Sequence, residues 1–174
     1  MPGDVRREPG RGMRIAVVGA GAVGGYFGAM LARSGNDVFL VARGEHLATL
    51  KRAGLQVKSV TGDFHLRPAG DGVHATDDPA AIGRVEIVLF CVKSYDTTSA
   101  AGSLAPLLGP ETGVISLQNG IDNEGKIAGA IGQRHVMGGV AFIFARLAGP
   151  ARPSHGGPAP DHLWRAGWDP LPAS

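Results

Sequence analysis

The chain reads RIAVVGAGAVG from Arg14 to Gly24, and this stretch decides the fold. It places the pattern G-x-G-x-x-G directly after a short apolar run that is typical of a buried strand. The pattern alone is weak, because 28 glycines in 174 residues give roughly 0.7 matches by chance. Its position is more specific, since the residues after it predict a helix and a second strand, and so a complete βαβ unit.

The three glycines of this pattern have distinct expected roles. Gly19 permits a tight turn, Gly21 lets the backbone approach a pyrophosphate, and Gly24 lets the helix pack closely on the strand. The phosphates would lie at the amino end of the helix, where backbone N–H groups point at an anion. The alternative is a flexible glycine turn without a ligand, and the strand–loop–helix order favours the dinucleotide site.

Strand and helix patterns alternate along most of the chain. The predicted strands are residues 14–18, 37–41, 73–76, 85–92, 113–117 and 135–142, and the predicted helices are 22–33, 45–53, 96–108 and 123–131. Two further strands, 55–60 and 63–67, surround a turn at Thr61-Gly62 and form an inserted hairpin. Continuous apolar runs are typical of parallel strands that are covered on both faces. The sequence therefore predicts an α/β protein with a Rossmann-type, doubly wound, mostly parallel sheet and a small β-hairpin insertion.

The composition is that of a folded protein, with 44% hydrophobic and 18% charged residues. The net charge of +2 comes with arginines scattered along the chain, so no basic stripe for nucleic acid is indicated. Glycines interrupt the apolar residues 15–32, which argues against a signal peptide or a membrane span and makes the cytoplasm the expected location. Cys91 lies in an apolar run and is expected to be a buried hydrophobe rather than a reactive thiol.

The composition changes at both ends of the chain. Residues 1–12 carry Pro, Gly and Arg without apolar periodicity, which predicts a disordered leader. Residues 13–149 are the predicted dinucleotide-binding domain. Residues 150–174 hold six of the twelve prolines and no Val, Ile, Phe or Met, which predicts an irregular tail that cannot form a second core.

Arg43 follows the second predicted strand and indicates which cofactor the domain prefers. Domains that prefer NAD carry an acidic residue at this place, which accepts hydrogen bonds from the ribose hydroxyls. A guanidinium instead suits a 2′-phosphate, because it can donate two parallel hydrogen bonds to it. The alternative is an exposed surface arginine. We expect NADPH rather than NADH.

Lys93 and Asn119 each follow the carboxyl end of a predicted parallel strand, which is where doubly wound sheets bind ligands. Lys93 could contact a substrate carboxylate or carbonyl, and Asn119 could hydrogen-bond both cofactor and substrate. The alternatives are a solvated lysine at a strand end and an Asn-Gly turn.

Five motifs in order resemble one family. These are Met13-Arg14-Ile15 leading into GAGAVG, Val41-Ala42-Arg43, Cys91-Val92-Lys93-Ser94, Leu117-Gln118-Asn119-Gly120 and Val136-Met137-Gly138-Gly139. Over residues 13–149 the chain resembles the N-terminal domain of the ketopantoate reductases (2-dehydropantoate 2-reductases). The resemblance implies NADPH-dependent reduction of 2-dehydropantoate, a 2-keto acid, to (R)-pantoate in pantothenate and coenzyme A synthesis.

The resemblance also implies roles for individual residues. The pyrophosphate would lie on Gly19, Ala20, Gly21, Ala22, Val23 and Gly24. Arg43 would bind the 2′-phosphate, Lys93 would lie beside the nicotinamide and the substrate, and Asn119 would contact both ligands. Ile143 would make a further cofactor contact through its backbone.

The family also has a helical C-terminal domain, which carries its proton-donating lysine and further substrate and cofactor contacts. We expect this domain to be absent here and the tail to come from a shifted reading frame or a false gene end. The expectation is NADPH binding with little turnover, and self-association through apolar surface near residues 140–144. A related dehydrogenase of the opine or glycerol-3-phosphate type and a non-enzymatic nucleotide-sensing module remain alternatives.

Overall fold

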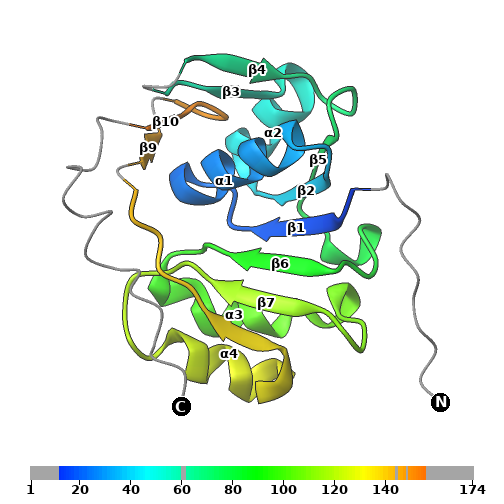
Figure 1. Cartoon of the computed structure of the whole chain (residues 1–174), viewed down its shortest axis with the longest axis vertical. Helices are drawn as coiled ribbons and strands as arrows, with labels where there is room; N and C mark the ends of the chain where they lie inside the picture. Colours follow the sequence, from blue (N-terminus) through cyan, green and yellow to red (C-terminus); the bar gives the residue numbers. More distant parts are fainter. Residues whose placement is uncertain (1–11, 60–61, 144, 148, 156–174) are drawn as a thin grey trace, which may run out of the picture.

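Within the residues that the structure describes, a six-stranded parallel sheet forms the centre of the fold (Figure 1). The structure is a computed structural model and describes residues 12–59, 62–143, 145–147 and 149–155. The strands of the sheet are β1 (Arg14–Val18), β2 (Asp37–Val41), β5 (Val73–Thr76), β6 (Ile87–Phe90), β7 (Gly113–Ser116) and β8 (Val136–Gly138). Their spatial order is β5-β2-β1-β6-β7-β8, so the direction of winding reverses between β1 and β6. This confirms the predicted doubly wound, Rossmann-type sheet, and such reversal points are where these sheets bind ligands.

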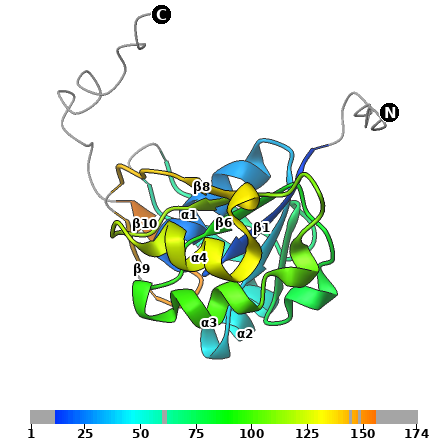
Figure 2. The ribbon, with the colours of Figure 1, turned by 90° about the horizontal axis from the view of Figure 1, so that it is seen from below.

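Alternate residues of β1 face opposite layers of helices. Ile15 and Val17 pack in one core cluster with residues of α1 (Ala22–Arg33) and α2 (Gly44–Ala53). Ala16 and Val18 pack in a second cluster with residues of α3 (Thr97–Gly102) and α4 (Asn123–Ile131), two helices that lie side by side (Figure 2). Because both faces are covered, all four of these strand residues are buried, and the strand is apolar without alternation.

Small residues along α1 let this helix lie close to the sheet. A Cβ on Gly28 would lie 3.0 Å from Leu40 Cδ2 and 3.2 Å from Val17 Cγ2. Glycine inside a helix costs about 0.5–1 kcal/mol relative to alanine, and the close approach of helix and sheet offsets that cost. The helix ends at Arg33, after which Ser34 Oγ donates to the Met30 carbonyl.

Two antiparallel hairpins pack beside α1 (Figure 1). The inserted hairpin is confirmed, with β3 (Leu55–Val57) paired to β4 (Phe64–Leu66), although both strands are shorter than the predicted ranges 55–60 and 63–67. A second hairpin pairs β9 (Ala145–Leu147) with β10 (Pro153–His155) and was not predicted.

The expected irregular tail from residue 150 onward is wrong for residues 151–155. Ala151 is 2% exposed and belongs to the core cluster on the α1 face, and its carbonyl accepts a hydrogen bond from Gln56 N at 3.0 Å. Pro153 packs against Gly25 of α1. A three-residue strand that contains proline has no detectable period, so only its contacts reveal it. Residues 1–11 of the predicted leader and 156–174 of the predicted tail lie outside the described residues, and the domain bounds stay predictions.

Three other predicted elements are shorter or broken. The predicted helix 96–108 divides into η2 (Ser94–Asp96), α3 and η3 (Ala105–Leu107). It breaks because the amide and hydroxyl of Ser103 both donate to the Ala100 carbonyl, and because Pro106 has no N–H to donate. The predicted strand 85–92 is strand only over β6, and 135–142 is strand only over β8, since the ladder with β7 ends at Gly138. The remaining strands and helices of the parallel sheet unit agree with the prediction to within one residue.

None of the helices in the described part of the chain is long and apolar enough to cross a bilayer. The same residues contain no group of three or more His, Cys, Asp or Glu side chains that could hold a metal ion.

Candidate functional site

A cavity of about 640 Å³ opens at the edge of the sheet where the parallel strands end. Its lining comes from the loops after β1, β2, β5, β6 and β7, so it includes the point where the winding reverses. The predicted site residues that line it are Gly19, Ala20, Gly21, Ala22, Val23, Arg43, Lys93 and Asn119. The volume lies in the range of about 300–1,000 Å³ that is usual for small-molecule sites.

Two glycines of the loop are required by the packing of the protein itself. Gly19 has φ +94°, and a Cβ there would lie 2.7 Å from Val92 N. A Cβ on Gly24 would lie 2.4 Å from the Gly19 carbonyl oxygen and 2.9 Å from Val17 Cγ1. Gly24 does not line the cavity but permits the close helix–strand packing that the motif predicts.

Gly21 differs, because no neighbouring atom requires a glycine there. A Cβ on Gly21 would have no atom within 4 Å, and the residue faces the cavity. Its N–H donates no hydrogen bond to any described residue. Gly21 is also the N-cap of α1, which has no side-chain cap and no acidic residue in its first turn. The residues present therefore fit a pyrophosphate. It would accept hydrogen bonds from the N–H of Gly21 and from the first N–H groups of α1, at the positive end of the helix dipole.

Arg43 and His46 bring polar groups to the cavity from the start of α2. Arg43 is the N-cap of α2, it is exposed, and its guanidinium makes no ion pair or hydrogen bond within the described residues. His46 is half-buried, and its Nε2 lies 2.6 Å from the carbonyl oxygen of Ala20 in the glycine loop. His46 was not predicted from the sequence, because a histidine inside an amphipathic helix carries no motif.

Lys93 and Asn119 line the cavity from adjacent loops. Lys93 is the N-cap of η2 and is exposed, and its ammonium has no hydrogen-bond or ion-pair partner among the described residues. Asn119 is exposed, and its main-chain carbonyl accepts a hydrogen bond from Asn123 Nδ2 at 3.0 Å. The structure thus brings these two predicted residues to one cavity, at the ends of neighbouring strands β6 and β7.

A buried polar network joins these two loops. Gln118 Nε2 donates to the Val92 carbonyl and to Thr97 Oγ1, both at 2.8 Å. Thr97 Oγ1 lies 3.1 Å from Asn123 Oδ1 and 2.9 Å from the Ser94 carbonyl, and its single proton can donate to only one of them. Thr97 and Asn123 are fully buried. Because all members have partners, the network can hold both loops in place.

Other cavity residues were not predicted. Asp77 follows β5, and Ser94 and Gln118 follow β6 and β7. Their common signal is the position just after a parallel strand, the same position that predicted Lys93 and Asn119. Ile143 is half-buried and lies outside the cavity lining, whereas Ala145 contributes to it. The predicted cofactor contact of Ile143 stays a prediction.

Cys91 also lines the cavity, at the end of β6. Burial raises the pKa of the Cys91 thiol to about 12, because the thiolate would lose its hydration there. The thiol is therefore protonated at neutral pH, which agrees with the predicted inert, hydrophobic role.

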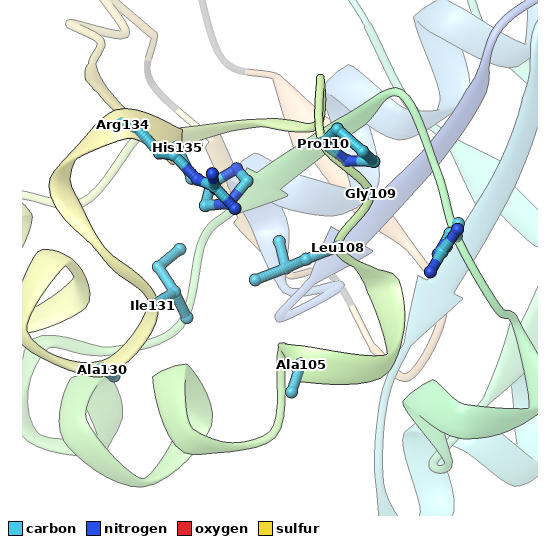
Figure 3. A pocket seen from close by; sticks show the side chains of 9 residues that line it. Ala105, Leu108, Gly109, Pro110, Ala130, Ile131, Arg134 and His135 are labelled. Atoms are coloured by element: carbon cyan, nitrogen blue, oxygen red, sulfur yellow. The ribbon is translucent and has the colours of Figure 1, made fainter.

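A second cavity, of about 420 Å³, lies at the opposite edge of the sheet (Figure 3). Leu108 and Ile131 give it apolar walls, and Arg134 and His135 also line it. His135 is buried; its Nε2 accepts from Arg134 Nε at 3.1 Å, so its Nδ1–H donates to the Thr112 carbonyl at 2.9 Å. None of the predicted site residues lies in this cavity, and His135 is a satisfied structural residue. We therefore assign the functional site to the cavity at the carboxyl ends of the strands.

The family model described as Ketopantoate reductase PanE/ApbA matches residues 15–166 of the chain. The chain belongs to the ketopantoate reductase family. The match continues past residue 149, where we expected the resemblance to end.

Individual relatives agree with this assignment. A 2-dehydropantoate 2-reductase from Archaeoglobus fulgidus is 38% identical over 138 residues, which cover 79% of this chain and 42% of that relative. The crystal structure of a PanE/ApbA family ketopantoate reductase from Ralstonia eutropha JMP134 is 39% identical with a TM-score of 0.76, over 83% of this chain and 47% of the other. A structure of D-mandelate dehydrogenase with NADH and anilino(oxo)acetate is 27% identical with a TM-score of 0.74, over 83% and 46%. The chain spans less than half of the length of these three relatives.

Proposed function

We propose that this domain binds NADPH and presents Lys93 and Asn119 to a 2-keto acid, as the nucleotide-binding part of a 2-dehydropantoate 2-reductase. One observation carries the proposal: Gly21, with open space beside it, faces the same cavity as Arg43, and neither the Gly21 N–H nor the Arg43 guanidinium has a partner among the described residues. A pyrophosphate fits the N–H of Gly21, and a 2′-phosphate fits the guanidinium of Arg43.

Arg43 supports NADPH over NADH. The similar D-mandelate dehydrogenase was solved with NADH, so likeness to these proteins alone does not select the cofactor. Here the residue after β2 and Ala42 is an arginine at the N-cap of α2 and not an acid that would accept from the ribose hydroxyls. Its guanidinium has no carboxylate partner in the described residues, so it is available to a phosphate.

Lys93 and Asn119 support a 2-keto acid substrate. NADPH supplies the hydride for reduction of the keto carbon. Lys93 offers a mobile ammonium that can donate to the keto oxygen or pair with the carboxylate of the substrate. Asn123 donates a hydrogen bond to the main-chain carbonyl of Asn119 and so holds this residue. The side-chain amide of Asn119 offers both a donor and an acceptor. The reactions in the names of the relatives, such as 2-dehydropantoate 2-reductase, make 2-dehydropantoate the proposed substrate.

Titration of the purified chain with NADPH and NADH, followed by cofactor fluorescence, tests the cofactor proposal. We expect tighter binding of NADPH than of NADH. Arg43→Ala should weaken NADPH about 10- to 100-fold and leave NADH almost unchanged, because hydrogen bonds to charged groups contribute about 1.5–3 kcal/mol. Arg52→Ala removes the same charge at the other end of α2, outside the cavity, and should change neither affinity. Equal binding of both cofactors, or equal effects of the two variants, would sink the NADPH assignment.

Turnover is a separate prediction. Lys93 is the only amine side chain among the residues that line the cavity, and one ammonium would have to hold the substrate and also protonate the developing alkoxide. A well-placed general acid contributes about 10²–10⁴-fold, so we expect slow reduction of 2-dehydropantoate by this chain. Steady-state oxidation of NADPH at rates ordinary for enzymes, about 1–10³ s⁻¹, would contradict it.

A further inference from the structure

Both ring nitrogens of His46 are occupied by backbone groups from distant parts of the chain. Ala151 N donates to Nδ1 at 3.0 Å, and Nε2 lies 2.6 Å from the Ala20 carbonyl oxygen. Since Nδ1 accepts a hydrogen bond, the proton of the neutral ring lies on Nε2 and is donated to Ala20. His46 therefore has no free polar atom with which to bind a ligand directly.

The bond to Ala20 sets the orientation of the peptide group between Ala20 and Gly21. In a trans peptide the C=O and the N–H point in opposite directions, and the described residues contain no cis bond. When His46 holds the carbonyl of Ala20, the N–H of Gly21 must point away from the imidazole. This is the N–H that has no acceptor within the described residues and lies at the cavity.

A glycine at position 21 makes this peptide easy to invert. Inversion rotates ψ of Ala20 and φ of Gly21, and glycine adopts positive φ without a Cβ clash. The open space beside Gly21 offers no steric barrier. The Ala20 N–H already donates to the Val41 carbonyl at 3.2 Å, which holds Ala20 in place. Only the peptide group between Ala20 and Gly21 would then rotate.

The imidazole is itself held by a buried part of the fold. Ala151 is buried in the core, and its carbonyl accepts from Gln56 N while its N–H donates to His46. Pro153, two residues later, accepts from Lys58 N and packs on Gly25 of α1. The segment before β10 thus fixes the ring, and the ring fixes the glycine loop.

We propose that His46 is a positioning residue that locks the Ala20–Gly21 peptide so that the Gly21 N–H is presented to the pyrophosphate of the dinucleotide. The ligand class rests on the proposed function, but the locked peptide does not, because the hydrogen bonds that create it lie within the protein. The same contacts make the β9–β10 hairpin a structural support of the phosphate site.

Two substitutions separate the two bonds of His46. In His46→Asn, the side-chain oxygen lies about where Nδ1 does and can accept from Ala151 N, but no donor reaches the Ala20 carbonyl. In His46→Gln, the side-chain N–H lies about where Nε2 does and can donate to the Ala20 carbonyl, but the side chain cannot also accept from Ala151 N. His65→Asn is the matched control, because His65 is an exposed histidine whose Nε2 bonds the Ala53 carbonyl away from the cavity.

Nitrogen-15 NMR of the cofactor-free chain tests the lock directly. The wild type should show His46 protonated on Nε2, and the amide signal of Gly21 should be single and sharp. His46→Asn should shift or broaden that signal, His46→Gln should restore it, and His65→Asn should leave it unchanged. A Gly21 signal that is the same in wild type and His46→Asn would overturn the proposal.

Titration with NADPH and NADH provides the second readout. His46→Asn should weaken both dinucleotides by a similar factor, about two- to tenfold, because one oriented hydrogen bond is at stake and the pyrophosphate is common to both. His46→Gln should recover most of the affinity. A loss that Gln does not recover would overturn the role of the Nε2 donor. If the wild type binds neither dinucleotide, the proposed function fails, while the Gly21 signal still decides the role of His46.

Discussion

A Cβ on Gly24 would lie 2.4 Å from the carbonyl oxygen of Gly19, so the first and last glycines of the loop contact each other backbone to backbone. No rotamer change can relieve that contact, because the nearest atom belongs to the main chain. Gly24→Ala should therefore destabilise the fold by about 1–3 kcal/mol, measured by urea unfolding. Gly125→Ala is the control, since a Cβ on Gly125 of α4 meets nothing within 4 Å and should stabilise by about 0.5–1 kcal/mol. Equal effects of the two variants would contradict the packing role of Gly24.

Gly21→Ala should give the opposite pattern to Gly24→Ala. The φ of Gly21 is −73°, which alanine adopts freely, and its Cβ would enter open space. Folding should change by less than about 1 kcal/mol, the cost of alanine at an N-cap. The new methyl group would occupy the place proposed for the pyrophosphate, so NADPH and NADH should both bind about tenfold more weakly or worse, equivalent to about 1.4 kcal/mol. Unchanged binding of both dinucleotides would show that the phosphates lie elsewhere.

The sequence predicted the roles of these glycines because the motif is local. Strand, loop and helix follow one another within residues 14–33, so a linear pattern contains the geometry. The same reasoning placed Arg43, Lys93 and Asn119 at one edge of the sheet, because parallel strands all end at that edge.

The sequence could not predict what depends on distant contacts. His46 acquires its place through Ala20 and Ala151, which lie 26 and 105 residues away along the chain. β10 lies against β9, α1 and β3, which are all distant or separate elements, and its three residues have no period of their own. The predicted strand 135–142 was too long because its apolar residues were counted as strand, although β7 offers a partner only as far as Gly138.

Thr97→Val should destabilise the protein and loosen the Lys93 and Asn119 loops together. Valine keeps the shape of threonine but leaves the Gln118 amide with one acceptor fewer and puts a methyl group beside the buried Asn123 Oδ1. The expected loss is about 1–3 kcal/mol in urea unfolding, and Thr97→Ser should recover most of it. Thr98→Val, on the exposed side of α3, should stay within about 0.5 kcal/mol of the wild type. A Thr97→Val protein as stable as the wild type would show that the network contributes nothing.

The chain should self-associate through exposed apolar residues that follow β6, β7 and β8. Val140 is 80% exposed and Phe142 is 67% exposed, and Tyr95 and Ile121 are also exposed in the loops after β6 and β7. Exposed apolar groups of this kind favour association, because contact removes them from water. Light scattering should show a mass that rises with protein concentration. The double variant Val140→Ser, Phe142→Ser should reduce that rise, and a wild type that remains monomeric at all concentrations would rule the association out.

The raised pKa of Cys91 predicts that the free energy of unfolding falls at alkaline pH. Its thiol has a pKa of about 12 in the folded chain, against a reference value of 9.0. Below pH 9 both the folded and unfolded states are protonated, and the group does not change the stability. Between pH 9 and about 12 the unfolded chain loses the proton while the folded chain retains it, so the free energy of unfolding falls as pH rises.

Comparison with Cys91→Ala isolates this contribution from the other groups that titrate in the same range. Urea unfolding at pH 8 and pH 10 should show a larger loss of stability for the wild type than for Cys91→Ala. The thiol should also react slowly with DTNB at pH 8 in the folded chain and rapidly in denaturant, and the readout is simple because the chain has one cysteine. Fast reaction of the folded chain would mean that the loop after β6 opens often enough to expose the thiolate, and the inert role of Cys91 would be wrong.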